Sequence, residues 1–269
     1  MEVHVLTLFP DYFTSPLQTG LMGLAREEGR LQVQVHDLRR WTHDRHGTAD
    51  DYAFGGGPGM VLKPEPFFEA LDELRSEGLE GSAPVVLTTP QGRLFDQQAA
   101  RDLAARDQWV VLCGRYRGID ERVREALVTH EYSVGDVILN GGEAAALVYV
   151  EAAARLLPGA IGDPASAAAD SFENGLLDHP HYTRPAEYRG LGVPEVLLSG
   201  HHAAIERWRR ERSLESTLRV RPDLLEKTEL SEVDQEFLER LRAGRPTREP
   251  APADDGEGIE GTAGTGETR

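Results

Sequence analysis

The sequence predicts an α/β protein in which a parallel-sheet domain is followed by a small helical domain. Two observations carry this prediction. Short apolar runs alternate with amphipathic segments, which is typical of β-α-β units. Three of the apolar runs, residues 83–89, 109–113 and 136–139, also break into turns rich in Gly or Pro. In an open α/β sheet, ligands bind outside the carboxyl ends of the strands, so these turns predict a small-molecule site built largely from backbone.

The chain begins with a strand, a helix and a second strand. Residues 2–8 form an apolar run that Pro10 halts, which predicts the first strand. A helix is expected over residues 16–28, because Gly29 follows it as a stop signal. Apolar and polar residues alternate over residues 31–38, which predicts the second strand.

A long segment without regular periodicity, residues 39–60, comes next. Such a segment in a compact domain is usually functional or disordered. Its aromatic residues, cations and glycines are the mix that an RNA-binding surface uses, although the run GGGPG at residues 55–59 could equally form a mobile lid. His43 and His46 lack a third ligand at metal-binding spacing, so no metal site is predicted.

The rest of the first domain alternates helices and strands. Helices are expected at residues 64–77, from the Asp96 cap to 106, and at 119–128, and paired strands around Val134 and Val137. Residues 143–157 predict a helix that is apolar on most sides. Such a helix needs burial on more than one side, and a two-fold dimer interface would supply the second.

Composition changes after Pro158. The sequence predicts a first domain over residues 1–158, a linker over 159–175, a helical domain over 176–244 and a tail over 245–269. Helices are expected at residues 170–177, 201–212, 214–220 and 232–243. The tail has no aromatic residue and one large aliphatic residue, so it cannot offset its ordering entropy and is expected to be disordered.

Charge and cysteine content limit the partners. The net charge of −17 argues against indiscriminate binding to DNA or other nucleic acid. Residues 184–221 nevertheless carry eight Arg against five Glu, which permits docking of one shaped anion. No apolar run approaches the roughly 20 residues that a membrane helix needs. The only cysteine, Cys113, excludes an internal disulfide and reads as a small buried residue, and a cytoplasmic location is expected.

Several strings, in order over residues 1 to 245, resemble the bacterial tRNA (guanine-N1)-methyltransferases, which modify the guanine immediately 3′ of the anticodon, at position 37. They are FPDYF at Phe9, THDRHGTADD at Thr42, GGGPGM at Gly55, PQGR at Pro90, CGRYRGIDERV at Cys113, SVGDVILNGGE at Ser133, RLLPG at Arg155, ADSFENGLLDHPHYTRP at Ala169 and VLLSGHHAAIERWR at Val196. Periodicity alone does not lead to this family.

The resemblance implies a fold and a methyl donor. The α/β domain is expected to contain a deep trefoil knot, and the protein to be an obligate homodimer with composite active sites. The three turns named above correspond to the loops with which the family holds S-adenosylmethionine. The implied cofactor residues are Thr88, Thr89, Pro90, Gly114, Tyr116, Val134, Gly135, Asp136, Val137, Ile138, Leu139, Asn140, Gly141 and Gly142.

The resemblance also implies two catalytic residues. N1 of guanine carries a proton, so a carboxylate must accept it, and Asp170 matches the family's general base. Arg155 matches the arginine that stabilises charge on guanine O6. Each residue has a competing structural interpretation. Asp170 and Glu173 have capping-box spacing, and Arg155 is a cation at a helix C-terminus.

Recognition of the tRNA anticodon stem-loop is expected from two regions. Asp44, Arg45, His46 and Gly59 are expected to cover the target base, which must leave its stack to reach the methyl group. Residues Arg207, Arg209 and Arg210 are expected to contact phosphates of the stem, with a solvated helix face as the alternative.

The sequence departs from the family pattern at two positions. Arg117 replaces the usual glutamate of the GRYEGID string, and Val137 stands where many members have an aromatic residue. A cation beside a cationic ligand predicts a weaker donor site and leaves open whether local carboxylates hold Mg²⁺. Two rival functions remain: ribose 2′-O methylation within the knotted superfamily, and tRNA binding with weakened or lost catalysis.

Overall fold

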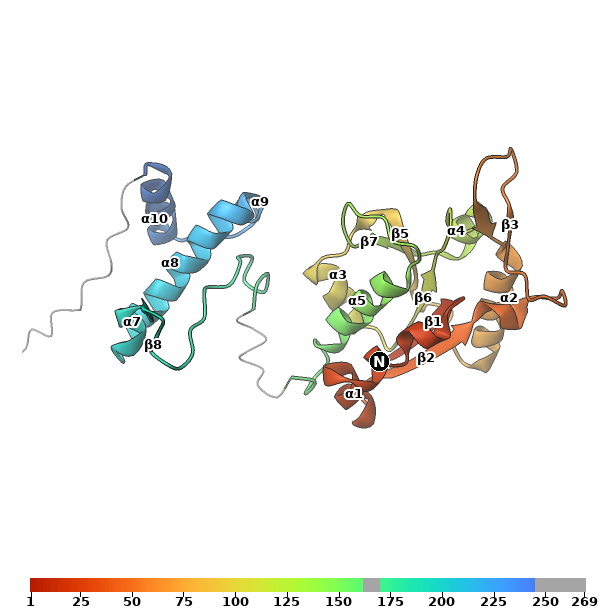
Figure 1. Ribbon diagram of the computed structural model, residues 1–269, viewed down its shortest axis with the longest axis horizontal. Coiled ribbons are helices and arrows are strands. Elements are labelled where there is room, and N and C mark those ends of the chain that lie inside the picture. The colour runs from red at the N-terminus through yellow and green to blue at the C-terminus, as the bar shows by residue number, and fades with distance from the viewer. Residues whose placement is uncertain (162–169, 245–269) are drawn as a thin grey trace, which may run out of the picture. The chain divides into compact units, whose positions relative to one another are not determined.

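The computed structural model describes residues 1–161 and 170–244 of the chain (Figure 1). The chain divides into two compact units with a boundary at residues 167–168. The predicted tail, residues 245–269, and the middle of the predicted linker lie outside the described residues. The predicted domain limits at 158 and 176 therefore stay predictions.

The first unit is built on a five-stranded sheet with the strand order β2-β1-β6-β5-β7. Every neighbouring pair in this sheet is parallel, which confirms the predicted α/β class with a parallel sheet. The strands are β1 (Glu2–Thr7), β2 (Gln32–Asp37), β5 (Val85–Leu94), β6 (Gln108–Cys113) and β7 (His130–Ser133).

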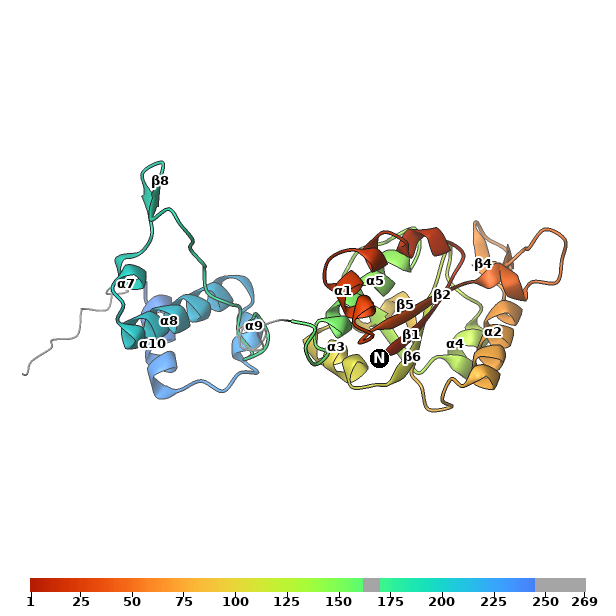
Figure 2. The same ribbon diagram turned by 90° about the horizontal axis from the view of Figure 1, so that it is seen from below.

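Helices cover both faces of this sheet (Figures 1 and 2). Alternate residues of β6 point to opposite cores, with Trp109 and Val111 in one and Val110 and Leu112 in the other. The first core is completed by α1 (Gly20–Glu27), α3 (Gln97–Ala104) and α5 (Glu143–Ala154), and the second by α2 (Pro64–Glu77) and α4 (Glu121–Leu127). Within the described residues, no helix is long and apolar enough to cross a membrane.

The helix predicted over residues 16–28 is interrupted. A short 3₁₀ segment, Pro16–Gln18, precedes α1, because Thr19 is extended and Gly20 has a φ of +59°. The residues expected to be irregular, 39–60, overlap a 3₁₀ turn, Leu38–Trp41, and an antiparallel pair of β3 (Asp50–Tyr52) and β4 (Met60–Leu62). A third 3₁₀ segment, Pro10–Phe13, follows β1.

The ends of β5 and β7 differ from the prediction. Strand β5 continues to Leu94, but Thr88 and Arg93 both lie opposite Tyr132, so the residues between them bulge out of the ladder. The turn expected at residues 90–92 is therefore present as a bulge inside a longer strand. The strand predicted around Val137 is wrong: β7 ends at Ser133, and Gly135, with a φ of +125°, directs the chain away from the sheet.

The second unit contains a small core and mostly helices. Its elements are β8 (Glu187–Tyr188), β9 (Leu191–Gly192), α7 (Glu195–Leu198), α8 (His202–Val220), α9 (Pro222–Leu225) and α10 (Glu232–Arg242). The core consists of Leu176, Leu214, Leu225, Phe237 and Leu238. One continuous helix, α8, replaces the two helices predicted over 201–220, because no Gly or Pro interrupts it.

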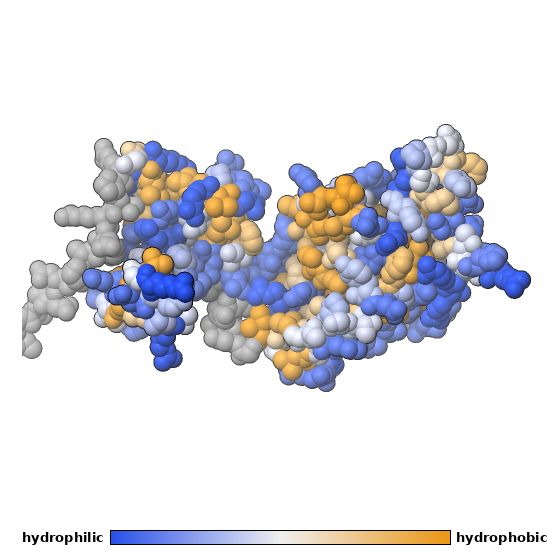
Figure 3. All heavy atoms as spheres, in the orientation of Figure 1, coloured by the Kyte–Doolittle hydropathy of each residue, from blue (hydrophilic) through white to orange (hydrophobic). Residues whose placement is uncertain are grey.

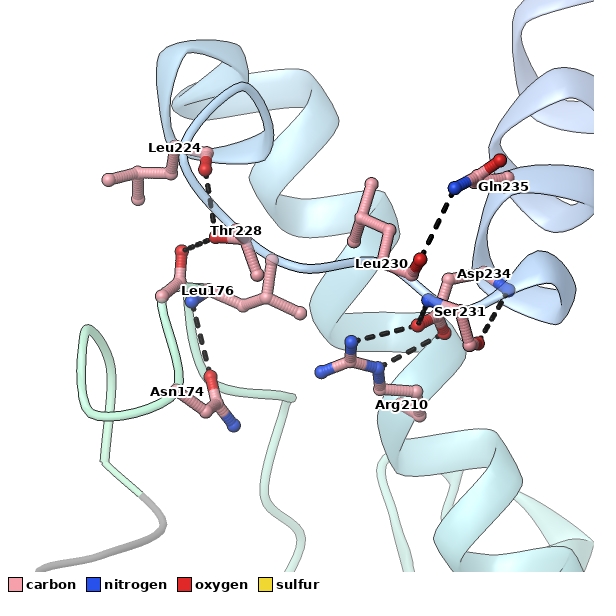
Figure 4. A network of polar contacts seen from close by, with 10 residues as sticks. Asn174, Leu176, Arg210, Leu224, Thr228, Leu230, Ser231, Asp234 and Gln235 are labelled. Atoms are coloured by element: carbon pink, nitrogen blue, oxygen red, sulfur yellow. Dashed lines mark hydrogen bonds and ion pairs between the residues drawn. The ribbon is translucent and has the colours of Figure 1, made fainter.

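The helix predicted over residues 170–177 is also wrong, because this segment forms turns. Phe172 has a φ of +74°, which a continuous α-helix does not contain. The side chain of Asn174 instead accepts a hydrogen bond from the Leu176 N–H (3.1 Å) (Figure 4). Thr228 holds the same turn by donating to the Gly175 carbonyl (2.9 Å).

Candidate functional site

A cavity of about 320 Å³ lies where β5, β6 and β7 end. This size is at the lower end of the range for small-molecule sites. Three loops form its walls: the β5 bulge, residues 114–119 after β6, and residues 137–142. All the predicted cofactor residues line it except Gly135 and Asp136. The residues that the sequence placed at separate strand ends thus surround one cavity.

The third loop passes close to the other two. The N–H of Gly142 donates to the Gly114 carbonyl (2.8 Å), and Gly141 forms an antiparallel bridge with Arg115. A Cβ atom on Gly142 would overlap the Thr88 hydroxyl and approach the Cys113 Cα to 3.0 Å. Glycine is therefore required at position 142, because the backbone crosses the ends of two strands there.

A buried carboxylate fixes the start of α5 beneath this loop. Glu143 is 3% exposed, and its Oε1 accepts a hydrogen bond from the Thr7 hydroxyl (2.8 Å). Its Oε2 lies 3.5 Å from Nη1 of Arg115, whose guanidinium stacks over the Phe9 ring at 4.0 Å. This network was not predicted from the sequence. The signal was an acid at the first residue of a mostly apolar helix, where a buried charge requires a partner.

Thr88 and Cys113 have structural roles beside the cavity. The Thr88 hydroxyl donates to the Leu112 carbonyl (3.1 Å) and accepts from the Gly114 N–H (3.3 Å), so it ties the first two loops together. Cys113 is 1% exposed, and burial raises the pKa of its thiol well above the usual value. These findings agree with the prediction of a small buried residue that is not a nucleophile.

The two predicted catalytic residues belong to different units. Arg155 caps the C-terminus of α5 in the first unit. Asp170 belongs to the second unit, where its carbonyl accepts a hydrogen bond from the Glu173 N–H (3.2 Å). The helix that a capping box at Asp170 would begin is not formed. The catalytic roles of both residues remain predictions.

Of the residues predicted to cover the target base, Asp44 shapes its own loop. Its carboxylate accepts hydrogen bonds from the N–H groups of Thr48 (2.9 Å) and His46 (2.8 Å). These bonds hold the pKa of Asp44 below its usual value, and the bond from Thr48 has the largest effect. Arg45 and His46 are exposed on this loop, and Gly59, with a φ of +93°, lies against the Arg117 side chain.

The predicted phosphate-binding arginines differ in their surroundings. Arg210 makes two hydrogen bonds to Asp234 (3.1 and 2.9 Å), and so links α8 to α10 (Figure 4). Arg209 pairs with Glu206 one turn away (2.7 Å). Arg207 is exposed on the same helix. Of the three arginines, Arg210 is therefore the one for which a role in stability is the strongest alternative to phosphate binding.

Three side chains of the second unit lie close enough together to share a metal ion. Asp178, His179 and His181 offer ligand atoms within 4.8 Å of one another, and the His181 Nε2 lies 2.7 Å from the Asp178 carboxylate. This group was not predicted from the sequence, although the string DHPH at residues 178–181 was its signal. His43 instead pairs with Glu69 (2.8 Å).

Comparisons with known proteins agree with these observations. The sequence profile described as tRNA (Guanine-1)-methyltransferase TrmD matches residues 1–227. The chain is 50% identical over 250 residues to the tRNA (guanine-N(1)-)-methyltransferase of Moorella thermoacetica, covering 93% of this chain and 100% of that protein. The proteins of the same name from Geobacter sulfurreducens and Dehalococcoides mccartyi strain BAV1 are 50% identical over 247 residues and 48% over 248. These two alignments cover 91% and 92% of this chain and 100% of each relative.

Proposed function

The chain belongs to the tRNA (guanine-N1)-methyltransferase family, and on this premise we propose that it transfers the methyl group of S-adenosylmethionine to N1 of the guanine at tRNA position 37. Methylation of a tRNA guanine at N1 is the activity of its named relatives. The observation that carries the proposal for this chain is the cavity at the ends of β5, β6 and β7, which three loops line mainly with backbone.

The residues around the cavity fit a methyl donor with an adenosyl group. Gly114, Gly141 and Gly142 line the cavity with backbone, and their missing Cβ atoms let the loops that carry them pack closely together. The side chains of Val137, Ile138 and Leu139 add apolar surface to one wall. Backbone N–H and C=O groups would recognise the edges of adenine, and the apolar wall would cover its faces.

The proposed chemistry uses one base and one cation. S-adenosylmethionine supplies an electrophilic methyl carbon bound to a sulfonium sulfur. The Asp170 carboxylate accepts the N1 proton of guanine, which frees the N1 lone pair to form the new bond to carbon. The Arg155 guanidinium stabilises the negative charge that grows on O6 as this proton leaves.

We further propose a homodimer with composite active sites and a knotted chain. Apolar side chains exposed on the first unit support the dimer, and Figure 3 shows apolar surface gathered over the region of β7 and α5. They include Leu94, Val137, Ile138, Leu139 and Val148. The knot is supported by the path of residues 134–142, which return from the edge strand β7 to pair beside Gly114 and Arg115.

The proposed partner is the anticodon stem-loop of tRNA, bound through the loop at Asp44–His46, Gly59 and the arginines of α8. A requirement for Mg²⁺ would have to be met by carboxylates near the cavity, and Glu121 is one that lines it. Activity measured with and without a chelator tests this requirement. A cytoplasmic location likewise stays a prediction.

One experiment tests the proposed function against its rivals. The protein is incubated with radiolabelled S-adenosylmethionine and a tRNA transcript carrying guanine at position 37, and the labelled nucleoside is identified. Label on N1 of that guanine is expected, and a transcript with adenine at position 37 is the control. Label on a ribose 2′ oxygen would support the other reaction class, and tRNA binding without transfer would support a binding protein.

A further inference from the structure

We propose that Arg117 is a positioning residue that holds the glycine segment, residues 55–59, against the loop after β6 and thereby prepares the segment to receive tRNA. The proposal rests on the function proposed above, because that function makes the glycine segment part of the tRNA-binding surface. It gives a task to a side chain whose charge differs from the family pattern.

Arg117 reaches from the cavity wall to the glycine segment. It lines the cavity, and its Nη1 donates a hydrogen bond to the Pro58 carbonyl (3.0 Å). Its aliphatic part lies against Gly59, where an added Cβ would come within 2.9 Å of Cγ and 3.0 Å of Cδ. The side chain thus holds the segment by a charged donor at one residue and by contact with the next.

The backbone fixes the end of the segment beside Arg117. The N–H of Arg117 donates to the Met60 carbonyl (3.1 Å), and the N–H of Leu62 donates to the Gly118 carbonyl (3.1 Å). Leu62 also forms a parallel bridge with Ile119. Strand β4 is therefore joined to the loop after β6, and the Arg117 side chain extends this connection back to Pro58.

The remainder of the segment has little else to restrict it. Gly55, Gly56 and Gly57 have φ angles of +83°, +79° and +107°, and a Cβ on any of them would meet nothing within 4 Å. The neighbouring Phe54 side chain is fully exposed. Glycine loses the most conformational freedom on ordering, so one directed hydrogen bond has a large effect on how often the segment occupies this position.

Two arginines of the loop after β6 therefore perform different tasks. Arg115 turns inward to Glu143 and Phe9, and holds the loop that ends at Gly142. Arg117 turns to Pro58 and Gly59. The loop thus connects the wall of the cavity to the glycine segment, and Arg117 makes the contact with that segment.

The test compares Arg117→Ala, Gly59→Ala, their double mutant and Arg117→Lys in the full chain. Arg122→Ala is the matched control, because it removes an exposed arginine that pairs with Asp120 on the neighbouring helix α4 and does not line the cavity. Amide hydrogen exchange of residues 53–60 reports on the segment. The KM for tRNA, kcat and the Kd for S-adenosylhomocysteine report on the site.

Arg117→Ala and Gly59→Ala are both expected to speed exchange of residues 53–60 and to raise the KM for tRNA about fivefold. In Arg117→Ala, kcat and the Kd for S-adenosylhomocysteine, whose sulfur carries no charge, should stay within about twofold of wild type. Because both changes disrupt one contact, the double mutant should be no worse than the worse single mutant. Arg117→Lys retains a donor, so its exchange rates and its KM for tRNA should stay close to those of wild type. Arg122→Ala should behave as wild type.

Unchanged exchange of residues 53–60 in Arg117→Ala would overturn the proposal, as would effects of the two single mutants that multiply in the double mutant. A changed Kd for S-adenosylhomocysteine with unchanged exchange would make Arg117 a donor-binding residue instead. Failure of the proposed function would look different: the wild-type protein would not methylate tRNA, while the exchange differences would persist.

Discussion

At the scale of single residues, the parallel sheet contains a buried pair of imidazoles. His4 and His36 lie side by side on β1 and β2, with Nδ1 of His4 3.1 Å from Nε2 of His36. Burial, with the nearby His4 and then Arg40, lowers the pKa of His36 to about 4. Burial also lowers the pKa of His4, against the opposing effect of Glu2. Both rings are therefore neutral in the folded protein at neutral pH.

This pair predicts a pH dependence of stability. In the unfolded chain the histidine pKa is ordinary, near 6.5, so the unfolded state binds protons more readily than the folded state. The contribution of the pair to stability is therefore fully present above this pH and is lost as the pH falls toward 4. The free energy of unfolding should fall by about 1 kcal/mol per pH unit in this window. Urea denaturation of wild type and His36→Gln between pH 7.5 and 4.5 measures it. Equal slopes for the two proteins would contradict the prediction.

A second prediction concerns the proposed base. Asp170→Asn removes the proton acceptor and leaves a side chain of nearly the same shape, so folding and binding of S-adenosylhomocysteine should persist. Single-turnover methylation should fall at least about a hundredfold, the usual effect of losing a proton-transfer group. Rapid-quench measurement with saturating tRNA provides the rate. An unchanged rate would remove Asp170 from the mechanism.

The features that could be predicted from the sequence are those that depend only on neighbouring residues. The glycine turns at residues 114 and 141–142 follow directly from the composition, and the structure brings them to one cavity. The contact between Thr7, Glu143 and Arg115 could not be predicted in the same way, because these residues are brought together by the order of the strands. Periodicity contains no information about that order.

At the scale of elements, the structure differs from the prediction mainly at the ends of the strands. The apolar run 136–139 has a composition typical of a strand, yet Ile138 is 83% exposed and the run lies outside the sheet. A β-propensity describes side chains that fit a half-buried surface, and here a ligand or a partner would provide that surface. By contrast, α2 has the predicted bounds, because Pro64 stands at its first turn and Gly78 ends it with a φ of +119°.

The crossing of the third loop over β5 and β6 predicts the effect of Gly142→Ala. The new methyl group would overlap the Thr88 hydroxyl and press on the Cys113 backbone, which cannot move without disturbing β6. The loop should shift, and the affinity for S-adenosylhomocysteine should fall more than about tenfold. Calorimetric titration measures it. Gly81→Ala is the control, since nothing lies within 4 Å of a Cβ there, and equal affinities in both variants would argue against a close-packed crossing.

At the scale of the whole molecule, the proposed mechanism requires residues of both units. The cavity belongs to the first unit, and the proposed base belongs to the second. The exposed apolar residues beside the cavity are those expected of a surface that a second copy covers. A two-fold dimer would use the same surface on both copies, and this arrangement allows the second unit of one copy to serve the cavity of the other.

Mixing two impaired variants tests this arrangement, at a concentration of S-adenosylmethionine that saturates wild type but is too low to saturate Gly142→Ala. Asp170→Asn retains the cavity, and Gly142→Ala retains the base, so a mixed dimer has one complete site if the base acts across the interface. Random exchange of subunits should restore about a quarter of wild-type activity, because half of the dimers are mixed and each has one working site. Each variant exchanged with itself is the control. Mixed dimers that form but stay inactive would contradict composite sites.

The helices of the C-terminal part were predictable from the sequence, whereas the predicted domain limits stay predictions. The proposed knot cannot be predicted in this way, since threading depends on the path of the backbone and leaves no periodic signal in the residues. The length of α8 could have been predicted, because residues 202–220 contain neither Gly nor Pro.

The wide spacing of the cavity residues has a consequence during synthesis. The lining runs from Leu87 to Tyr149, and its third wall follows the edge strand β7. A nascent chain that has emerged only as far as residue 130 contains β1, β2, β5 and β6 but lacks this wall. The proposed cofactor site is therefore incomplete until residues through Tyr149 have been translated, so a cofactor that binds there cannot act as a template for the early steps of folding on the ribosome.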